Sequence, residues 1–244
     1  MNPPARRCIL AVFAHPDDET STAAGTFSKY AREGVDIHVV TATRGELGEL
    51  GTGDLTIARR DLPAVREAEL RAVLALYGAN RPILLDYRDQ ELLTADFETL
   101  TQDVLRAMAS VQPDVVITFG PSGISDHNDH KTIHHAATEA FHRYRHTAVV
   151  APRLYYVAIP HEVAAQFALH LHPSEMTLSV CIDIAEVKPM KLQGLRTYRS
   201  QTDAQELAVL FASDQFMHEW FYQAYPVLSP TESPARGFWH EVAP

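Results

Sequence analysis

The sequence contains little cysteine and no concentrated positive charge. Its 244 residues include only two cysteines, Cys8 and Cys181, each in an apolar stretch, which excludes a disulfide framework and a zinc site built on paired cysteines. The formal net charge is −10 and the basic residues form no run. Because binding to a phosphate backbone needs a basic face, we expect no nucleic-acid partner.

Long apolar runs are also absent. No stretch approaches the roughly 20 apolar residues of a membrane-spanning helix, and the short polar segment 1–7 lacks the features of a signal peptide. We therefore expect a cytoplasmic protein with no membrane span. Hydrophobic residues make up 46% of the chain, which is enough for a substantial core.

Strand-like and helix-like segments alternate through the first 144 residues. Apolar runs predict strands, periodic stripes predict helices, and glycine or proline follows several of them. The predicted strands are 8–13, 35–41, 83–85 and 115–119, and the predicted helices are 22–32, 61–77, 97–111 and 131–144. This alternation is typical of a mainly parallel sheet flanked by helices, so we predict a Rossmann-like α/β fold.

The rest of the chain is less regular. Segments 154–159 and 177–184 resemble strands, and 187–198 and 204–211 resemble helices. No linker, repeat or low-complexity tract interrupts the sequence. We therefore predict a single domain over residues 1–244, with a surface tail over residues 229–244.

Two polar clusters follow predicted strands. His15, Asp17 and Asp18 come after strand 8–13, and His127-Asn128-Asp129-His130 comes after strand 115–119. The carboxyl ends of parallel strands meet at one edge of a sheet, and imidazole and carboxylate are ligands of catalytic zinc. Each cluster by itself could also be a helix cap. Their shared edge favours a metal site in which His15 and Asp18 bind the ion, together with one of the later histidines.

The same motifs resemble the LmbE-like (PIG-L) family of zinc-dependent N-deacetylases. The run Ala14-His15-Pro16-Asp17-Asp18-Glu19, the later His127-x-Asp129-His130 and the distance between them carry the resemblance. It implies that zinc is bound by His15, Asp18 and His130, and that Asp17 is the general base. It also implies that His127, when protonated, stabilises the oxyanion or acts as the acid, that Asp129 tunes His127, and that Arg66 contacts substrate.

The sequence departs from the usual family pattern at three positions. Asp126 replaces a glycine before His127 and adds a negative charge that would raise the pKa of His127 if it lies close. Asn128 replaces a proline, and Tyr198 stands where a histidine is common. None of these departures affects the residues implied as zinc ligands.

We therefore expect a zinc-dependent hydrolase that removes an N-acetyl group from an amino sugar or its conjugate. The alternatives are a zinc hydrolase of another small amide or ester, and a non-catalytic, metal-dependent sugar-binding protein. The loop 44–57 and the carboxyl-terminal third are expected to line the pocket. Another divalent metal, such as iron(II), also suits these ligands, and a homo-oligomer is compatible with the sequence. Either Asp17 or His127 could protonate the leaving amine.

Overall fold

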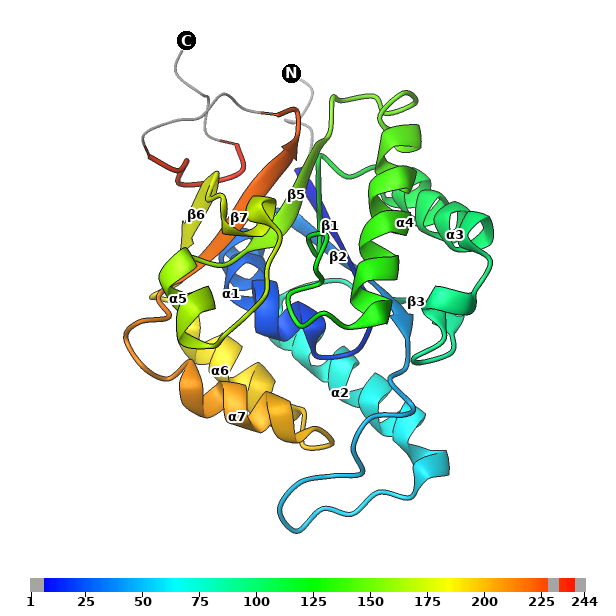
Figure 1. Cartoon of the computed structure of the whole chain (residues 1–244), viewed down its shortest axis with the longest axis vertical. Coiled ribbons are helices and arrows are strands. Elements are labelled where there is room, and N and C mark those ends of the chain that lie inside the picture. The colour runs from blue at the N-terminus through cyan, green and yellow to red at the C-terminus, as the bar shows by residue number, and fades with distance from the viewer. Residues whose placement is uncertain (1–6, 228–232, 240–244) are drawn as a thin grey trace.

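The computed structural model describes residues 7–227 and 233–239. Within them, seven strands form one sheet in the order β3-β2-β1-β4-β5-β7-β6 (Figure 1). Strands β1 to β5 are parallel, and β7 runs antiparallel to both β5 and β6. The strands are β1 (Cys8–Phe13), β2 (Asp36–Thr43), β3 (Ile83–Tyr87), β4 (Val115–Thr118), β5 (Arg153–Ala158), β6 (Val180–Asp183) and β7 (His218–Tyr225). The predicted single-domain, mainly parallel α/β fold is confirmed.

Helices cover both faces of the sheet. Helices α1, α2 and α6 pack together on one face, and α3 packs with α4 on the other (Figure 1). The α-helices are α1 (Asp18–Arg32), α2 (Leu62–Tyr77), α3 (Phe97–Val111), α4 (Asn128–Tyr144), α5 (His161–Gln166), α6 (Lys188–Thr197) and α7 (Thr202–Leu210). Single 3-10 turns lie at η1 (Arg59–Asp61), η2 (Leu92–Thr94) and η3 (Pro173–Met176).

The two central strands are apolar because both of their faces are covered. Every residue of β1 and of β4 is buried, as expected for parallel strands between two helical layers. Helix α1 also packs closely: a Cβ atom on Gly25 would lie 2.6 Å from the side chain of Ile184. The core is therefore centred on β1 and β4.

The order of the strands creates a crevice at the centre of the sheet. The chain passes from β1 outward to β2 and β3, and then returns to place β4 on the opposite side of β1. The connections after β1 and β4 therefore leave toward opposite faces, which opens a crevice at the carboxyl ends of these strands. Both polar clusters predicted from the sequence lie there, in residues 14–18 and 119–130.

Strand β7 was not anticipated from the sequence. Its buried face carries Glu219, Phe221 and Gln223, so the expected alternation of apolar and polar residues is broken. The two polar side chains have buried partners: Glu219 pairs with Lys191 at 2.7 Å, and Gln223 accepts a hydrogen bond from the Tyr155 hydroxyl at 2.9 Å.

Helix α1 begins earlier than predicted, at Asp18 instead of Thr22.

The predicted surface tail, residues 229–244, lies partly outside the described residues. In the described segment 233–239, Phe238 is fully buried and its ring contacts those of Tyr30 and Tyr155. Ala235 also bridges to Val180 of β6. This segment is therefore packed against the domain, with Phe238 in the core, and the rest of the predicted tail stays a prediction. Across the two described ranges, no helix has the length and apolar character needed to cross a membrane.

Candidate metal centre and active site

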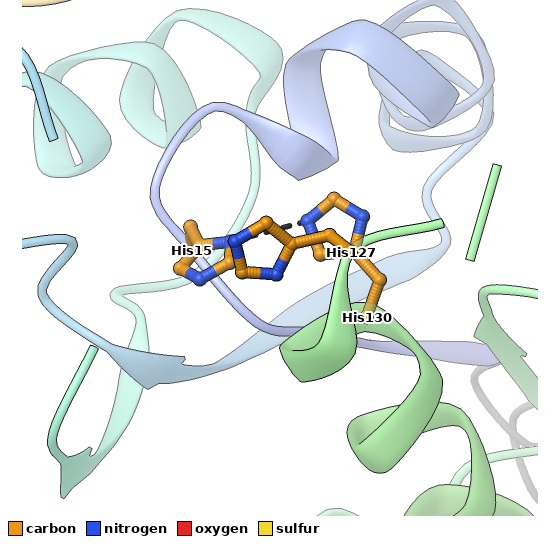
Figure 2. Close-up of side chains that lie close together, drawn as sticks. All are labelled: His15, His127 and His130. Atoms are coloured by element: carbon orange, nitrogen blue, oxygen red, sulfur yellow. Dashed lines mark hydrogen bonds between the residues drawn. The ribbon is translucent and has the colours of Figure 1, made fainter. Parts of the chain in front are cut away.

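Three predicted ligands converge at the central crevice. His15 lies on the loop after β1, Asp18 begins α1, and His130 lies in the first turn of α4. His15 Nδ1 is 3.1 Å from His130 Nε2, His130 Nε2 is 3.3 Å from Asp18 Oδ1, and His15 Nδ1 is 3.6 Å from Asp18 Oδ2. Figure 2 shows the rings of His15 and His130 close together, with His127 beside them.

These separations suit a tetrahedral metal ion. With metal–ligand distances of about 2.0–2.2 Å, two ligand atoms of a tetrahedron lie about 3.3–3.6 Å apart. The distances from His130 Nε2 to His15 Nδ1, 3.1 Å, and to Asp18 Oδ1, 3.3 Å, lie near that value, and the 3.6 Å contact of His15 Nδ1 is with the other oxygen of Asp18. Although burial opposes its charge, the neighbouring His130 and His15 lower the pKa of Asp18, so it is a carboxylate and can bind a cation.

Two further carboxylates lie behind the ring of His15. His15 Nε2 is 3.1 Å from Asp89 Oδ1 and 3.2 Å from Asp129 Oδ2. Despite the opposing effect of burial, Asp129, Asp18 and Asp89 raise the pKa of His15. A carboxylate on the far nitrogen of a metal-binding histidine orients the ring and directs the other nitrogen toward the metal.

His15, Asp89 and Asp129 also form a candidate metal-binding group, as do His15, His127 and His130. The first group faces Nε2 of His15, whereas Nδ1 of the same ring faces His130 and Asp18. Its carboxylates are held by backbone amides, as Asp18 is by those of Ala14 and His15. Asp129 accepts from the amides of Gln90 and Leu92 at 2.7 and 3.2 Å, and Asp89 accepts from that of Leu47 at 2.9 Å. We therefore interpret these two carboxylates as supports for His15.

Asp89 was missed by the sequence analysis. It lies just after β3, at the same edge of the sheet as the two clusters, in the polar run Asp86-Tyr87-Arg88-Asp89-Gln90. A polar run after a parallel strand, the signal that predicts the other two clusters, is present here as well. Asp129 was found, but its carboxylate contacts His15 and not His127 as expected.

Asp17 lies next to the ligands in a strained backbone conformation. Its φ angle is 102°, a left-handed value that residues other than glycine rarely adopt. Its backbone N–H donates to Glu19 Oε2 at 3.1 Å, and its carboxylate accepts from Arg66 Nη2 at 2.8 Å. Burial raises the pKa of Asp17, and Arg66 partly opposes that rise. Asp17 is thus held beside the predicted ligands with an increased affinity for a proton.

Arg66 is buried and directed toward Asp17. Its guanidinium also donates to the backbone carbonyls of Pro16, at 2.5 Å, and Gly45, at 3.0 Å. A Cβ atom on Gly45 would lie 2.1 Å from Arg66 Nη1, so the loop can approach the guanidinium only with glycine there. These contacts hold the buried guanidinium in place. The predicted contact with substrate stays untested.

A buried network lies beneath Asp17. The Tyr198 hydroxyl donates to Glu19 Oε1 at 2.7 Å, and Thr20 also donates to that oxygen at 2.5 Å. Burial raises the pKa of Glu19 to about 7. Tyr198, one of the departures from the family pattern, thus supports Glu19, which in turn accepts the hydrogen bond from the backbone N–H of Asp17.

His127 caps helix α4. Its Nδ1 accepts the backbone N–H of Asp129 at 3.1 Å, so in the neutral ring the proton is on Nε2. Burial and the nearby His15 and His130 lower the pKa of His127, which favours the neutral ring over the protonated form that the sequence hypothesis assumed. Asp126 does not raise this pKa as expected, because its carboxylate is exposed and pairs with Lys131 at 2.9 Å.

A cavity of about 530 Å³ opens beside these residues. Asp17, Asp18 and His130 line it, together with side chains of α5, α6, α7 and β7. The carboxyl-terminal third of the chain lines the cavity as predicted, but the loop 44–57 does not. That loop instead packs on Arg66 and Gln201.

Known proteins share both the sequence pattern and the fold. Residues 10–141 match the family model for PIG-L, described as GlcNAc-PI de-N-acetylase. The chain belongs to the PIG-L family. A relative from Mycolicibacterium vanbaalenii, a 1D-myo-inositol 2-acetamido-2-deoxy-alpha-D-glucopyranoside deacetylase, is 30% identical over 231 residues, covering 79% of this chain and 80% of that protein.

Other similarities show the limits of transferring an activity within the PIG-L family. A Rhodococcus jostii enzyme with the same description is 35% identical, but the match covers 56% of this chain and about half, 53%, of that protein. The 4-carboxy-2-hydroxymuconate hydratase of Pseudomonas putida matches with a TM-score of 0.69 and 21% identity, covering 93% of this chain and 100% of that one. A hydratase therefore has the same fold, and the reaction must be argued from the site itself.

Proposed function

We propose that this protein is a metal-dependent hydrolase that removes an N-acetyl group from an amino sugar or its conjugate. The observation that carries the proposal is the triangle of His15, Asp18 and His130 with Asp17 beside it. Membership of the PIG-L family supports the amide as the bond that is cleaved.

We assign the metal to His15 Nδ1, Asp18 and His130 Nε2. Two imidazoles and one carboxylate are a common ligand set of catalytic zinc, with at least one position left for water or substrate. When bound, such an ion supplies Lewis-acid activation of water and of the amide carbonyl. Iron(II) also accepts this ligand set, so we propose zinc and leave iron(II) as an outcome of metal analysis.

Asp17 acts as the general base in this proposal. Its carboxylate takes a proton from the water that attacks the acyl carbon, while the oxygen of that water forms the new C–O bond. Burial raises the pKa of Asp17, which increases its affinity for this proton, and Arg66 keeps the group oriented. The strained backbone at Asp17 fits a residue whose position serves the reaction.

His127 stabilises the developing oxyanion by donating its Nε2–H. A neutral imidazole is sufficient for this role, because an oriented, uncharged N–H donor can stabilise an oxyanion through a hydrogen bond. A neutral His127 has no imidazolium proton to release, so the protonated Asp17 is the better acid for the leaving amine. The proton taken from water is thus returned to the amine nitrogen as the C–N bond breaks.

The test combines metal analysis with amine release from N-acetylglucosamine and its simple glycosides. Wild-type protein should contain close to one zinc per chain and release free amine, and His130→Ala should lose both. Asp17→Asn should keep the metal and lose turnover.

Other outcomes would support the alternative functions. Metal and sugar binding without amine release would indicate a sugar-binding protein. Cleavage of acetate esters but not amides would indicate an esterase. A wild-type protein that binds no metal and stays inert after zinc is added would overturn the proposal. The cytoplasmic location and a homo-oligomer stay predictions from the sequence.

A further inference from the structure

The cavity beside the metal site is apolar over most of its wall. Val163 and Phe167 contribute from α5 and the segment after it, Leu207 from α7, and Phe211 and Phe216 from the connection to β7. All five are partly exposed; Phe167, for example, has 39% of its surface accessible. Contiguous exposed apolar surface is a mark of a binding site.

Apart from the proposed metal ligands, the described residues of this cavity offer no free lysine or arginine to an anionic group. Among the residues that line it, Lys191 is the only lysine or arginine, and its Nζ is 2.7 Å from Glu219 Oε1. Lys191 also donates to the carbonyl of Ser21 at 2.8 Å. Asp17 and Asp203 add negative charge to the wall. A phosphate or carboxylate would therefore meet repulsion here, whereas a neutral apolar group would not.

We propose that the substrate carries a neutral, unbranched apolar group of about four to eight carbons that lies against α5, α7 and residues 211–216. This inference rests on the proposed function, because it takes Asp17, Asp18 and His130 as the place where the amide is cleaved. The cavity is continuous with these residues, so its occupant belongs to the same molecule as the amide. Its volume, about 530 Å³, exceeds what an acetyl group requires and is typical of a small-molecule pocket.

The apolar group can come from either end of the substrate. It is the acyl chain of a longer N-acyl amide, or it is the aglycone of an N-acetylated sugar. Two substrate series separate these sources. One is glucosamine acylated with acetyl, butanoyl, hexanoyl or octanoyl groups, and the other is N-acetylglucosamine with methyl, butyl or hexyl as the β-aglycone.

The expected result is a rise of kcat/KM with chain length in one of the two series. Each methylene transferred from water to an apolar wall contributes about 0.8 kcal/mol, which is about fourfold in kcat/KM. From the shortest to the longest member we expect a gain of at least about thirtyfold. Turnover that is flat or falls with chain length in both series would overturn the inference and leave the deacetylase proposal standing.

A pair of variants on α7 tests the wall itself. Leu207 lines the cavity, whereas Val209, two residues later, is 78% exposed and does not line it. Leu207→Asn should reduce the gain with chain length to a few-fold, and Val209→Asn should preserve it. Thermal melting of both variants checks that they are folded. An unchanged gain in folded Leu207→Asn would contradict the inference.

A failure of the proposed function would be recognised separately. If no member of either series releases amine, calorimetric titration with hexyl and methyl β-D-glucoside tests the cavity without turnover. Binding of the hexyl glycoside that is at least tenfold tighter than that of the methyl glycoside, and is lost in Leu207→Asn, would support the apolar site. Equal binding or no binding of the two would overturn it.

Discussion

Replacing Arg66 with methionine separates two roles for this residue. The resemblance to the PIG-L family implies that Arg66 contacts substrate, whereas its guanidinium lies 2.8 Å from Asp17 and donates to two backbone carbonyls. If Arg66 positions the base, its loss should lower kcat and leave KM nearly unchanged. If it binds substrate, its loss should raise KM.

The size of the effect follows from burial. The side chain of Arg66 is 5% exposed and that of Asp17 is 16% exposed, so Arg66→Met leaves a mostly buried carboxylate without its partner. Breaking such a pair costs about 3–5 kcal/mol of stability. Because Asp17 is partly exposed, we expect the variant to lose about 3 kcal/mol of folding stability. A correctly placed general base contributes about 10²–10⁴ in rate, so we expect kcat to fall by about a hundredfold.

The assay is a set of steady-state measurements of kcat and KM from pH 5 to pH 9. Since Arg66 opposes the rise in the pKa of Asp17, its removal raises that pKa further, and the acidic limb of the kcat profile should move to higher pH. Arg66→Lys keeps the positive charge but not the branched guanidinium. It should therefore keep the acidic limb near its wild-type pH while kcat stays reduced.

Arg71→Met is the matched control. Arg71 lies on the same helix, and its exposed pair with Glu67 is worth less than about 1 kcal/mol. This variant should therefore leave kcat, KM and the pH profile unchanged. A tenfold rise in KM in Arg66→Met, with unchanged kcat and an unmoved acidic limb, would refute the positioning role and favour direct contact with substrate.

Three further predictions concern single side chains. Asp129→Asn should weaken metal affinity about 10- to 100-fold in competition with a chelating dye, because the amide cannot replace both carboxylate oxygens; unchanged affinity would contradict its support of His15. Asp17→Asn should lower turnover about 10²- to 10⁴-fold with full metal content, and an active variant would exclude Asp17 as the base. Burial lowers the pKa of His134 to about 4, so the unfolded chain binds a proton there that the folded chain does not. Stability, on the order of 3 kcal/mol, should therefore be lost as the pH falls from about 6.5 to 4. His134→Asn, which keeps a donor for the Phe119 carbonyl, should flatten that slope in urea unfolding; an unchanged slope would assign the acid sensitivity to other groups.

Local pattern was sufficient for most of the fold. Strands β1 and β4 are continuous apolar runs because both faces are covered, so their type and position could be read directly. Strand β7 could not be read because Glu219 and Gln223 are buried on it, and only Lys191 and Tyr155, distant in the sequence, make that burial favourable. Phe238 was likewise assigned to a surface tail because its partner rings lie far away along the chain.

Local sequence patterns are enough to indicate the class of fold and the residues around which a metal site can form. The reason is physical: His15, Asp17, Asp18 and His130 lie at the ends of strands whose parallel order brings those ends together. Tertiary structure alone decided the partners of those residues. It directs Arg66 to Asp17, places Asp89 and Asp129 behind His15, and surrounds the cavity with apolar side chains from the carboxyl-terminal third. Such contacts join elements far apart in the chain, and no local periodicity encodes them.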